Sequence, residues 1–236
     1  MGNFDIKIEK FLKAFIDNGG YHNVLTGLKN TMEIAIIGLL IGIAIGTLIA
    51  SIRVLPKYRT LPRALDKICS FYVAIFRGTP MVVQLLVFYY VLMPLMGIKI
   101  DGLNVAITVF GLNSGAYVSE IMRGGILSVD PGQLEGGRSV GMSYATTMFK
   151  IVIPQAIKNI LPTLGNEFIT LVKETSIVSF VGAMDLYKVF NDIGTNNYEF
   201  MVPYLVMAVI YIIIVCLITL GIKFTERRLR KSDRRS

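Results

Sequence analysis

The sequence is poor in the residues from which metal sites, disulfides and catalytic triads are built. Its 236 residues include one histidine, His22, and two cysteines, Cys69 and Cys216, without metal-ligand spacing. Zinc sites need clustered Cys and His side chains, and a serine triad needs a histidine beside its nucleophile. We therefore interpret His22 as structural and both cysteines as packing residues.

The chain also lacks the phosphate-binding loop of an ATPase. The pattern G-x-x-x-x-G-K-[ST] is absent, and the dipeptide Gly-Lys does not occur at all. In that loop, backbone N–H groups and the lysine hold the phosphates of ATP. We therefore expect no cofactor in this chain and no ATP hydrolysis by it.

Charged residues are scarce as well, at 17% of the chain, while 53% of residues are hydrophobic. Soluble domains are nearer to about 25% charged. Four charge-free runs explain the difference, at residues 34–52, 78–98, 102–119 and 200–222. Each approaches or exceeds the roughly 18 residues of a membrane-spanning helix, so an all-α integral membrane protein is predicted.

The distribution of Lys and Arg predicts how many times the chain crosses the membrane. Three basic clusters are Arg53, Lys57, Arg59, Arg63, Lys67 and Arg77; Arg123, Arg138, Lys150 and Lys158; and Lys223, Arg227, Arg228, Arg230, Lys231, Arg234 and Arg235. Basic residues collect on the cytoplasmic side, so an even number of crossings separates each pair of clusters. This requires a fifth crossing within residues 164–189. The prediction is five helices, with the N-terminus outside and the C-terminus in the cytoplasm.

This topology divides the chain into three parts. Residues 1–23 form an extracytoplasmic lead-in, residues 24–222 the membrane domain, and residues 223–236 a basic cytoplasmic tail. Apolar residues recur at helical spacing in the lead-in, at Phe4, Ile8, Phe11, Leu12 and Phe15. The lead-in is predicted to be either an amphipathic helix in the membrane interface or a short solvated helix.

A stripe of small residues lies in the first predicted span, at Gly38, Gly42 and Gly46. Such stripes allow two helix backbones to approach closely. Packing within the subunit is the favoured interpretation, and a dimer seam is the alternative.

Residues 128–163 form the largest polar segment between predicted spans. Asp130-Pro131-Gly132 predicts a turn, followed by a short helix and a break at Gly141.

The second helix of this polar segment is predicted to be amphipathic. It places Tyr144, Met148, Ile151 and Val152 on one apolar face, and Pro154 ends or kinks the pattern. An apolar face turned to the cytoplasm predicts a partner surface.

Within this segment, Glu135 is followed by Gly141 and then by Ile151, Ile153 and Pro154. The spacing resembles the "EAA" signature of ABC importer permeases, which reads Glu-Ala-Ala, three residues, Gly, nine residues and Ile-x-Leu-Pro. Two departures are Gly136-Gly137 in place of Ala-Ala, and Ile153 in place of Leu. The glycines lower helix propensity by up to about 1 kcal/mol each.

The resemblance extends over roughly residues 25–226. RGTPMVVQ at 77–84, AYVSEIMRGGI at 116–126, GQLEGGRS at 132–139 and LPTLGNEFITLVKETS at 161–176 resemble the polar amino-acid branch of these permeases. The four segments occur in order in a predicted five-helix membrane protein.

The resemblance implies a MetI-like permease subunit of a polar amino-acid ABC importer in a prokaryotic cytoplasmic membrane. Its implied partners are a second permease subunit, a pair of ATPase subunits that bind Mg-ATP, an extracytoplasmic solute-binding protein and membrane lipid, with no role for nucleic acid. The polar segment would be the coupling helix that docks into the ATPase. The implied coupling residues are Glu135, Gly136, Gly137, Gly141, Ile151 and Pro154.

Charges inside the predicted fifth crossing mark a candidate substrate site, because charges in membrane helices are costly and usually functional. The predicted substrate-binding residues are Glu167, Lys173, Glu174, Thr175, Ser176 and Gln84. A zwitterionic amino acid needs both a cationic and an anionic partner, which Lys173 and a glutamate could supply. The alternative is an internal Lys–Glu pair that only holds the helix in place.

Two other polar features lie near the inner ends of predicted spans. Pro80 forbids a regular helix through Thr79, and Arg77 is either an interface anchor or part of an inner gate. Glu120 and Arg123 are predicted to form a structural ion pair at i, i+3.

Three other functions stay open at this point. A permease of the same architecture could carry another small solute. A stand-alone ion-coupled carrier would need broken helices in an internal repeat, and no repeat is visible. A membrane enzyme would need a catalytic constellation, and none stands out.

Overall fold

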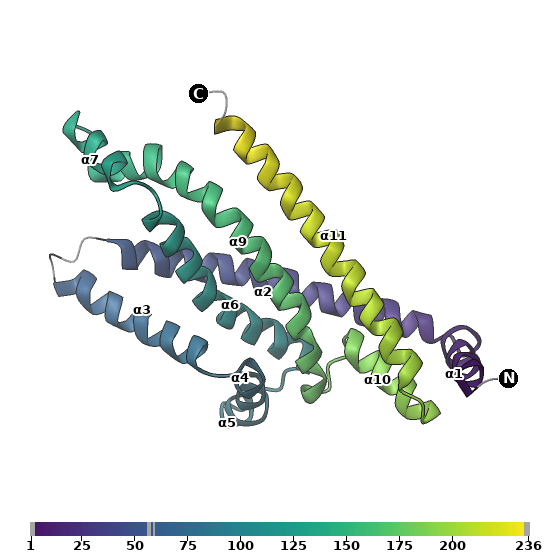
Figure 1. Ribbon diagram of the computed structural model, residues 1–236. Coiled ribbons are helices and arrows are strands. Elements are labelled where there is room, and N and C mark those ends of the chain that lie inside the picture. Colours follow the sequence, from purple (N-terminus) through teal and green to yellow (C-terminus); the bar gives the residue numbers. More distant parts are fainter. Residues whose placement is uncertain (1–2, 56–57, 59, 234–236) are drawn as a thin grey trace. The chain divides into compact units, whose positions relative to one another are not determined.

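The computed structural model describes residues 3–55, 58 and 60–233, without the side chains of Asn3 and of residues 229–233. Lys57 and Arg59 of the first basic cluster and Arg234 and Arg235 of the third lie outside the described residues, as do the side chains of Arg230 and Lys231. All regular secondary structure in the described residues is helical, which confirms the all-α prediction (Figure 1).

The α-helices are α1 (Asn3–Leu12), α2 (Gly20–Val54), α3 (Thr60–Gly78), α4 (Met81–Val87), α5 (Met93–Leu95), α6 (Gly102–Leu127), α7 (Pro131–Ser139), α8 (Tyr144–Thr147), α9 (Ile153–Glu174), α10 (Leu186–Asn197) and α11 (Met201–Asp233). Three π-helical stretches are η1 (Lys13–Asp17), η2 (Phe88–Leu92) and η3 (Met148–Val152), and η4 (Thr175–Val181) is a 3-10 helix.

Three described helices are long and apolar enough to cross a membrane. They are α2, α6 and the part of α11 from Met201 to Arg228. A fourth span arises if α3 and the stretch from α4 to α5 are counted as one broken crossing. Within the described residues, α9 does not pass the same test.

Within the second predicted span, residues 78–98, the structure is helical from Met81 to Leu95, through α4, η2 and α5. Gly78 ends α3, and the chain is extended at Pro80, with φ −62° and ψ 137°, before α4 begins at Met81. Pro80 has no N–H to donate and excludes the helical conformation from Thr79, as predicted.

The same break removes Arg77 from the first basic cluster. Arg77 lies in the last turn of α3, fourteen residues after Arg63, so the two are about 20 Å apart along the helix. α3 also carries Asp66 and Lys67 near its beginning. Because of these charges, α3 contains no long charge-free run and was not predicted as a helix.

The chain forms two compact units. Unit 1 comprises Met1–Gly38, Pro80–Gly111 and Thr170–Leu217, and unit 2 comprises Leu39–Thr79, Leu112–Ile169 and Ile218–Ser236. In unit 1, Phe11 of α1 joins a buried cluster with Phe190 of α10 and Val202 of α11. Lys7 of α1 forms an ion pair with Glu199 at 3.2 Å. The lead-in is therefore packed against the rest of unit 1.

The small-residue stripe of α2 packs against α6. In unit 1, a Cβ atom on Gly38 would lie 3.1 Å from the Cβ of Phe110. In unit 2, a Cβ on Gly42 would lie 2.5 Å from Ser114 Oγ, and one on Gly46 would lie 2.7 Å from Val118 Cγ1. These contacts confirm packing within the subunit as the use of the stripe.

Candidate functional site

The polar segment of unit 2 folds as two helical pieces joined at Gly141. Asp130 is the N-cap of α7 and accepts a hydrogen bond from the N–H of Gly132 at 2.7 Å, with Pro131 as the first helical residue. The predicted turn at 130–132 is therefore a helix start.

The break at Gly141 is confirmed. Its φ of +87° lies in the left-handed region, which glycine adopts without strain. The N–H of Gly141 donates to the carbonyl of Arg138 at 3.0 Å, and the N–H of Met142 donates to the carbonyl of Gly137 at 3.2 Å. These bonds close the end of α7 and turn the chain toward α8.

The two glycines that replace the alanines of the signature have different surroundings. Gly137 is buried, and a Cβ there would lie 2.4 Å from Thr147 Cγ2. Gly136 is exposed and has nothing within 4 Å of such an atom. Close packing of α7 on α8 therefore requires glycine at 137 and leaves position 136 free.

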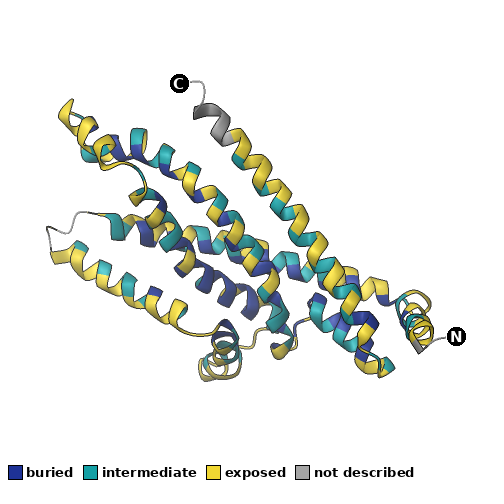
Figure 2. Ribbon diagram, in the orientation of Figure 1, coloured by how far each residue is buried: buried dark blue, intermediate teal, exposed yellow. Residues whose placement is uncertain are grey.

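The predicted open apolar face of the second helix is wrong. Met148 and Val152 are buried, as is Thr147, so this face packs inside unit 2. The exposed apolar side chains of the segment are Val140 and Phe149, which are 78% and 72% exposed. Figure 2 shows mostly exposed residues along α7.

Pro154 does not end the second helix. The π-helical stretch η3 directly precedes it, and α9 then continues to Glu174. A proline ring clashes with the carbonyl four residues earlier and offers no N–H to it. The wider π turn accommodates both effects.

Glu135 is exposed on α7, and its backbone carbonyl accepts the hydroxyl of Ser139 at 2.8 Å. On the inner side of the segment, Ile151 Cδ1 lies 3.3 Å from the position of a Cβ on Gly137. The six predicted coupling residues thus belong to one continuous part of unit 2, with Glu135 on its outside.

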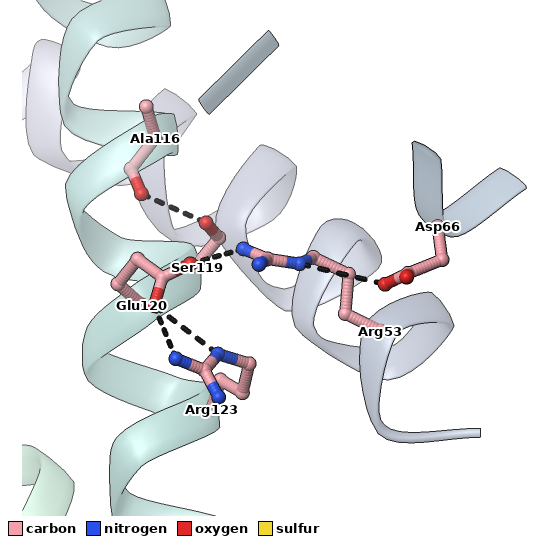
Figure 3. A network of polar contacts seen from close by, with 6 residues as sticks. All are labelled: Arg53, Asp66, Ala116, Ser119, Glu120 and Arg123. Atoms are coloured by element: carbon pink, nitrogen blue, oxygen red, sulfur yellow. Dashed lines mark hydrogen bonds and ion pairs between the residues drawn. The ribbon is translucent and has the colours of Figure 1, made fainter. Parts of the chain in front are cut away.

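A network of four charged residues lies elsewhere in unit 2. Glu120 of α6 pairs with Arg53 of α2, and its Oε2 is 2.7 Å from Arg123 Nη2. Arg53 Nε is 3.7 Å from Asp66 Oδ1 of α3 (Figure 3). The side chains of Arg53, Glu120 and Asp66 are only 16% to 18% exposed. The predicted pair of Glu120 and Arg123 is confirmed.

The sequence did not predict that Arg53 and Asp66 join this pair, because they come from other helices. One signal was available. Asp66 is the only acidic residue between Glu33 and Asp101, and an isolated acid among apolar runs usually has a partner.

The predicted substrate-binding residues are divided between the units. Glu167 is buried in unit 2, and the other five belong to unit 1. Thr175 is buried and donates to the carbonyl of Val172 at 2.8 Å, while Ser176 donates to the carbonyl of Lys173 at 3.3 Å. Both hydroxyl donors are thus used locally.

Lys173 is exposed, Glu174 is half-buried at the end of α9, and Gln84 is buried in α4. In the described part of the chain, no carboxylate lies within 4 Å of the Lys173 ammonium group. The alternative of an internal Lys–Glu pair stays open. Substrate binding by these six residues stays a prediction.

The described residues contain no group of three His, Cys, Asp or Glu side chains placed to hold a metal ion. The ring of His22 lies 4.1 Å from that of Tyr21, between centroids. Both cysteines are free thiols.

These features define an α-helical protein of the membrane with one folded polar segment between its apolar helices. Residues 42–231 match the family of binding-protein-dependent transport system inner membrane components, and the chain belongs to that family.

Two curated relatives match nearly the whole chain. The arginine transport system permease protein ArtQ of Bacillus subtilis (strain 168) is 38% identical over 210 residues, covering 89% of this chain and 94% of that protein. The putative glutamine transport system permease protein GlnP of Rickettsia bellii (strain RML369-C) is 39% identical over 206 residues, covering 87% and 92%.

A solved structure agrees with both. A chain of an amino acid ABC transporter crystallised with histidines superposes with a TM-score of 0.81 at 37% identity, covering 88% of this chain and 94% of that one. The resemblance to ABC importer permeases is therefore confirmed.

Proposed function

We propose that this chain is the membrane-spanning permease subunit of an ATP-driven importer of polar amino acids and forms its translocation pathway. The observation that carries the proposal is the 38% identity with a permease named for arginine transport, over 94% of that protein. Relatives named for glutamine and for arginine are equally similar, so the proposal specifies polar amino acids as a class.

The chain would act in a complex. Two permease subunits, identical or related, would enclose the pathway in a prokaryotic cytoplasmic membrane. A pair of ATPase subunits would hold Mg-ATP and carry out hydrolysis, and an extracytoplasmic binding protein would deliver the amino acid. This chain would supply the pathway and no catalytic group.

The proposed topology has five crossings. They are α2, the broken stretch from α3 to α5, α6, α9 and α11, with the N-terminus outside and the C-terminus in the cytoplasm. Single cysteines at Ser139 and Lys99, in a chain whose own cysteines are replaced by serine, test it. We expect a membrane-impermeant thiol reagent to reach position 99 only from outside and position 139 only from inside. The opposite pattern would overturn the orientation.

The segment 128–163 would be the coupling helix. Its folded core leaves Glu135, Val140 and Phe149 exposed, a combination of one charge and two apolar side chains that suits a protein interface. Gly141 would set the turn, and Gly137, Ile151 and Pro154 would hold the two helical pieces together.

The first test is co-purification of the chain with the ATPase encoded beside it. Glu135→Lys should release the ATPase and abolish uptake, while the permease stays folded and inserted. Asp17→Lys is the matched control, because it reverses an exposed acid in the lead-in and should leave the complex intact. Normal uptake by Glu135→Lys would remove the docking role.

Uptake of labelled L-arginine and L-glutamine by the reconstituted complex then tests the substrate class. Lys173→Ala should lower the stimulation of ATP hydrolysis by the amino acid, and an unchanged response would assign Lys173 to packing. Transport of a different solute would favour a permease of the same architecture for that solute. Transport by the chain alone would favour an ion-coupled carrier.

A further inference from the structure

An apolar hollow lies between α9 and α11 in unit 2. Its volume is about 330 Å³, and its lining includes Leu161, Phe168, Ile218 and Ile222. The two helices touch beside it, where a Cβ atom on Gly165 would lie 2.6 Å from Ile222 Cδ1. Ile218 and Ile222 belong to the charge-free run of α11, so this hollow lies at the depth of the membrane hydrocarbon.

A polar hollow adjoins the apolar one. Its volume is about 660 Å³, and its charged lining residues are Asp130, Lys158 and Glu226. Pro162 and Glu226 line both hollows, so the two meet there. Glu226 is four residues, or about 6 Å along α11, beyond Ile222, the last residue of the charge-free run. The polar hollow therefore lies at the membrane surface.

The polar groups of this second hollow are held in place by the fold. Asn159 Nδ2 donates to Ser128 Oγ at 2.9 Å, which joins α9 to the residue that follows α6. Asp130 is fixed as the N-cap of α7. Lys158 and Glu226 are half-buried, and each has an interaction within the chain. A ligand would meet charges that are already positioned.

The two hollows together fit an amphiphile. An apolar space at membrane depth that leads to a polar space at the surface matches the acyl chain and the headgroup of one phospholipid. Pockets between membrane helices that carry a cation at the membrane surface are known sites of lipid headgroups. Both volumes lie within the roughly 300–1,000 Å³ of small-molecule sites.

The charges of the polar hollow favour a zwitterionic headgroup. An anionic phospholipid would meet one cation, Lys158, but also two carboxylates, Asp130 and Glu226. In phosphatidylethanolamine, the phosphate can pair with the lysine, while the ammonium group donates charge-assisted hydrogen bonds to a carboxylate. The trimethylammonium group of phosphatidylcholine has no N–H to donate.

We propose that the two hollows bind one molecule of phosphatidylethanolamine, with an acyl chain between α9 and α11 and the headgroup at Lys158 and Glu226. In the proposed topology this lipid belongs to the cytoplasmic leaflet. The assignment goes beyond the proposed function, because it concerns the membrane around the chain and not the solute that is carried. Its failure would leave the import of amino acids untouched.

The experiment is native mass spectrometry of the full chain, purified in detergent with the subunits that accompany it. Phosphatidylethanolamine, phosphatidylcholine and phosphatidylglycerol with identical acyl chains are titrated in turn. We expect one phosphatidylethanolamine per permease chain to bind about 10-fold more tightly than phosphatidylcholine, the effect of a charge-assisted hydrogen bond, and more tightly than phosphatidylglycerol. Glycerophosphoethanolamine, which has the headgroup but no acyl chain, should not displace it.

Gly221→Leu tests the apolar hollow. Gly221 lines it, and a Cβ atom there would have nothing within 4 Å. Leucine should therefore fill the hollow without a clash and remove the tightly bound lipid. Ala208→Leu is the matched control, because Ala208 is exposed on the same helix and does not line the hollow. Its lipid binding should equal that of the wild type.

Two further variants separate the parts of the headgroup. Lys158→Gln should weaken the binding of phosphatidylethanolamine and phosphatidylcholine alike, roughly 10-fold, because both carry the phosphate. Glu226→Gln should weaken phosphatidylethanolamine alone and so reduce the preference for it. Lys67→Gln, which removes an exposed charge from α3, should change neither. Unfolding midpoints in detergent show that each variant is folded.

Three outcomes would overturn the assignment. The first is equal lipid occupancy in Gly221→Leu and the wild type. The second is tighter binding of phosphatidylglycerol than of phosphatidylethanolamine, or displacement of the lipid by glycerophosphoethanolamine. The third is a wild-type complex without a tightly bound phospholipid, which would mean that a neighbouring subunit covers the hollows.

Discussion

Two carboxylates, Glu120 in unit 2 and Asp185 in unit 1, have side chains 18% exposed and fully buried, respectively, and their charges are compensated in different ways. In unit 2, Glu120 is surrounded by Arg53 and Arg123. In unit 1, Asp185 is fully buried and accepts hydrogen bonds from the N–H groups of Tyr187 and Lys188, at 3.0 and 2.9 Å. One acid is compensated by charges and the other by the start of a helix.

The difference has a physical consequence. Ion pairs link residues from α2, α3 and α6, so removing Glu120 takes one partner from Arg53 and the ion-pair partner from Arg123. The cap at Asp185 is local, since α10 begins at the next residue. Burial without a paired cation raises the pKa of the Asp185 carboxyl to about 6, while the Lys188 ammonium group pairs with Asp192 instead. The charge on Asp185 is therefore a cost, and the charge on Glu120 holds helices together.

The largest expected effect comes from Glu120→Ala. It should lower the free energy of unfolding by up to about 3 kcal/mol, the upper range for hydrogen bonds to charged groups, because the side chains of Glu120 and Arg123 are 18% and 35% exposed. The measurement is the midpoint of thermal unfolding in detergent. A control in which all four charged residues of the network, Arg53, Asp66, Glu120 and Arg123, are replaced by methionine should recover much of the loss, because no charge of the network then lacks its partner. A single variant as stable as the wild type would show that the network contributes nothing.

Asp185→Asn should have the opposite sign and depend on pH. Asparagine keeps an oxygen that can cap α10 and carries no charge. The folded pKa of about 6 lies above the ordinary 3.8, so wild-type stability falls as the pH rises from about 4 to 6, and the full cost is present above 6. A shift of about two units corresponds to about 3 kcal/mol. Loss of the favourable interaction with the helix dipole returns up to about 1 kcal/mol.

We therefore expect Asp185→Asn to be about 2 kcal/mol more stable than the wild type at pH 7.5, with little difference near pH 4. Unfolding midpoints of both proteins across this range provide the measurement. Asp185→Ala, which loses the cap, is the control and should be less stable than Asp185→Asn at every pH. A stability difference that does not change with pH would refute the role of the buried charge.

Much of this fold could be predicted from the sequence, because its signals are local. Long apolar runs predicted α2, α6 and α11, and the break at Gly141 follows from one glycine. The pair of Glu120 and Arg123 follows from i, i+3 spacing.

Other features depend on contacts between distant parts of the chain and could not be predicted. Nothing in the local sequence joins Arg53 or Asp66 to Glu120. The apolar face with Met148 and Val152 was predicted to meet a partner, yet it packs within its own unit. Hydropathy also failed to predict α3, because its charged residues lower the mean hydropathy of the helix. In the structure these residues are paired or exposed.

The candidate sites show the same division. The polar segment 128–163 could be located because its motif is short and continuous. Its helical pieces are determined by Gly141 and by the N-caps of α7 and α8, Asp130 and Ser143. The predicted substrate-binding residues are spread from Gln84 to Ser176, so spacing within one helix could nominate Lys173 but could not show which of these residues lie together.

The smallest expected effects concern two neighbouring glycines of α7. Gly137 is buried against α8, and Gly136 is exposed without a neighbour. Gly137→Ala places its Cβ 2.4 Å from Thr147 Cγ2. The free-energy cost of moving these atoms apart should exceed the gain in helix propensity, so the free energy of unfolding should fall by about 1 kcal/mol. Gly136→Ala meets nothing and should gain up to about 1 kcal/mol. Unfolding midpoints of the two variants should therefore move in opposite directions.

Thr147→Ser in the background of Gly137→Ala removes the clashing methyl group and keeps the hydroxyl that donates to the carbonyl of Ser143 at 3.0 Å. This double variant should regain much of the lost stability, since the nearest remaining atom is the hydroxyl oxygen, at 3.0 Å from the alanine Cβ in place of the methyl carbon at 2.4 Å. If it stays as unstable as Gly137→Ala, the cost arises from the backbone of α7 and not from contact with α8. Such a result would mean that glycine at 137 is needed for the backbone conformation of α7 and not for its packing against Thr147.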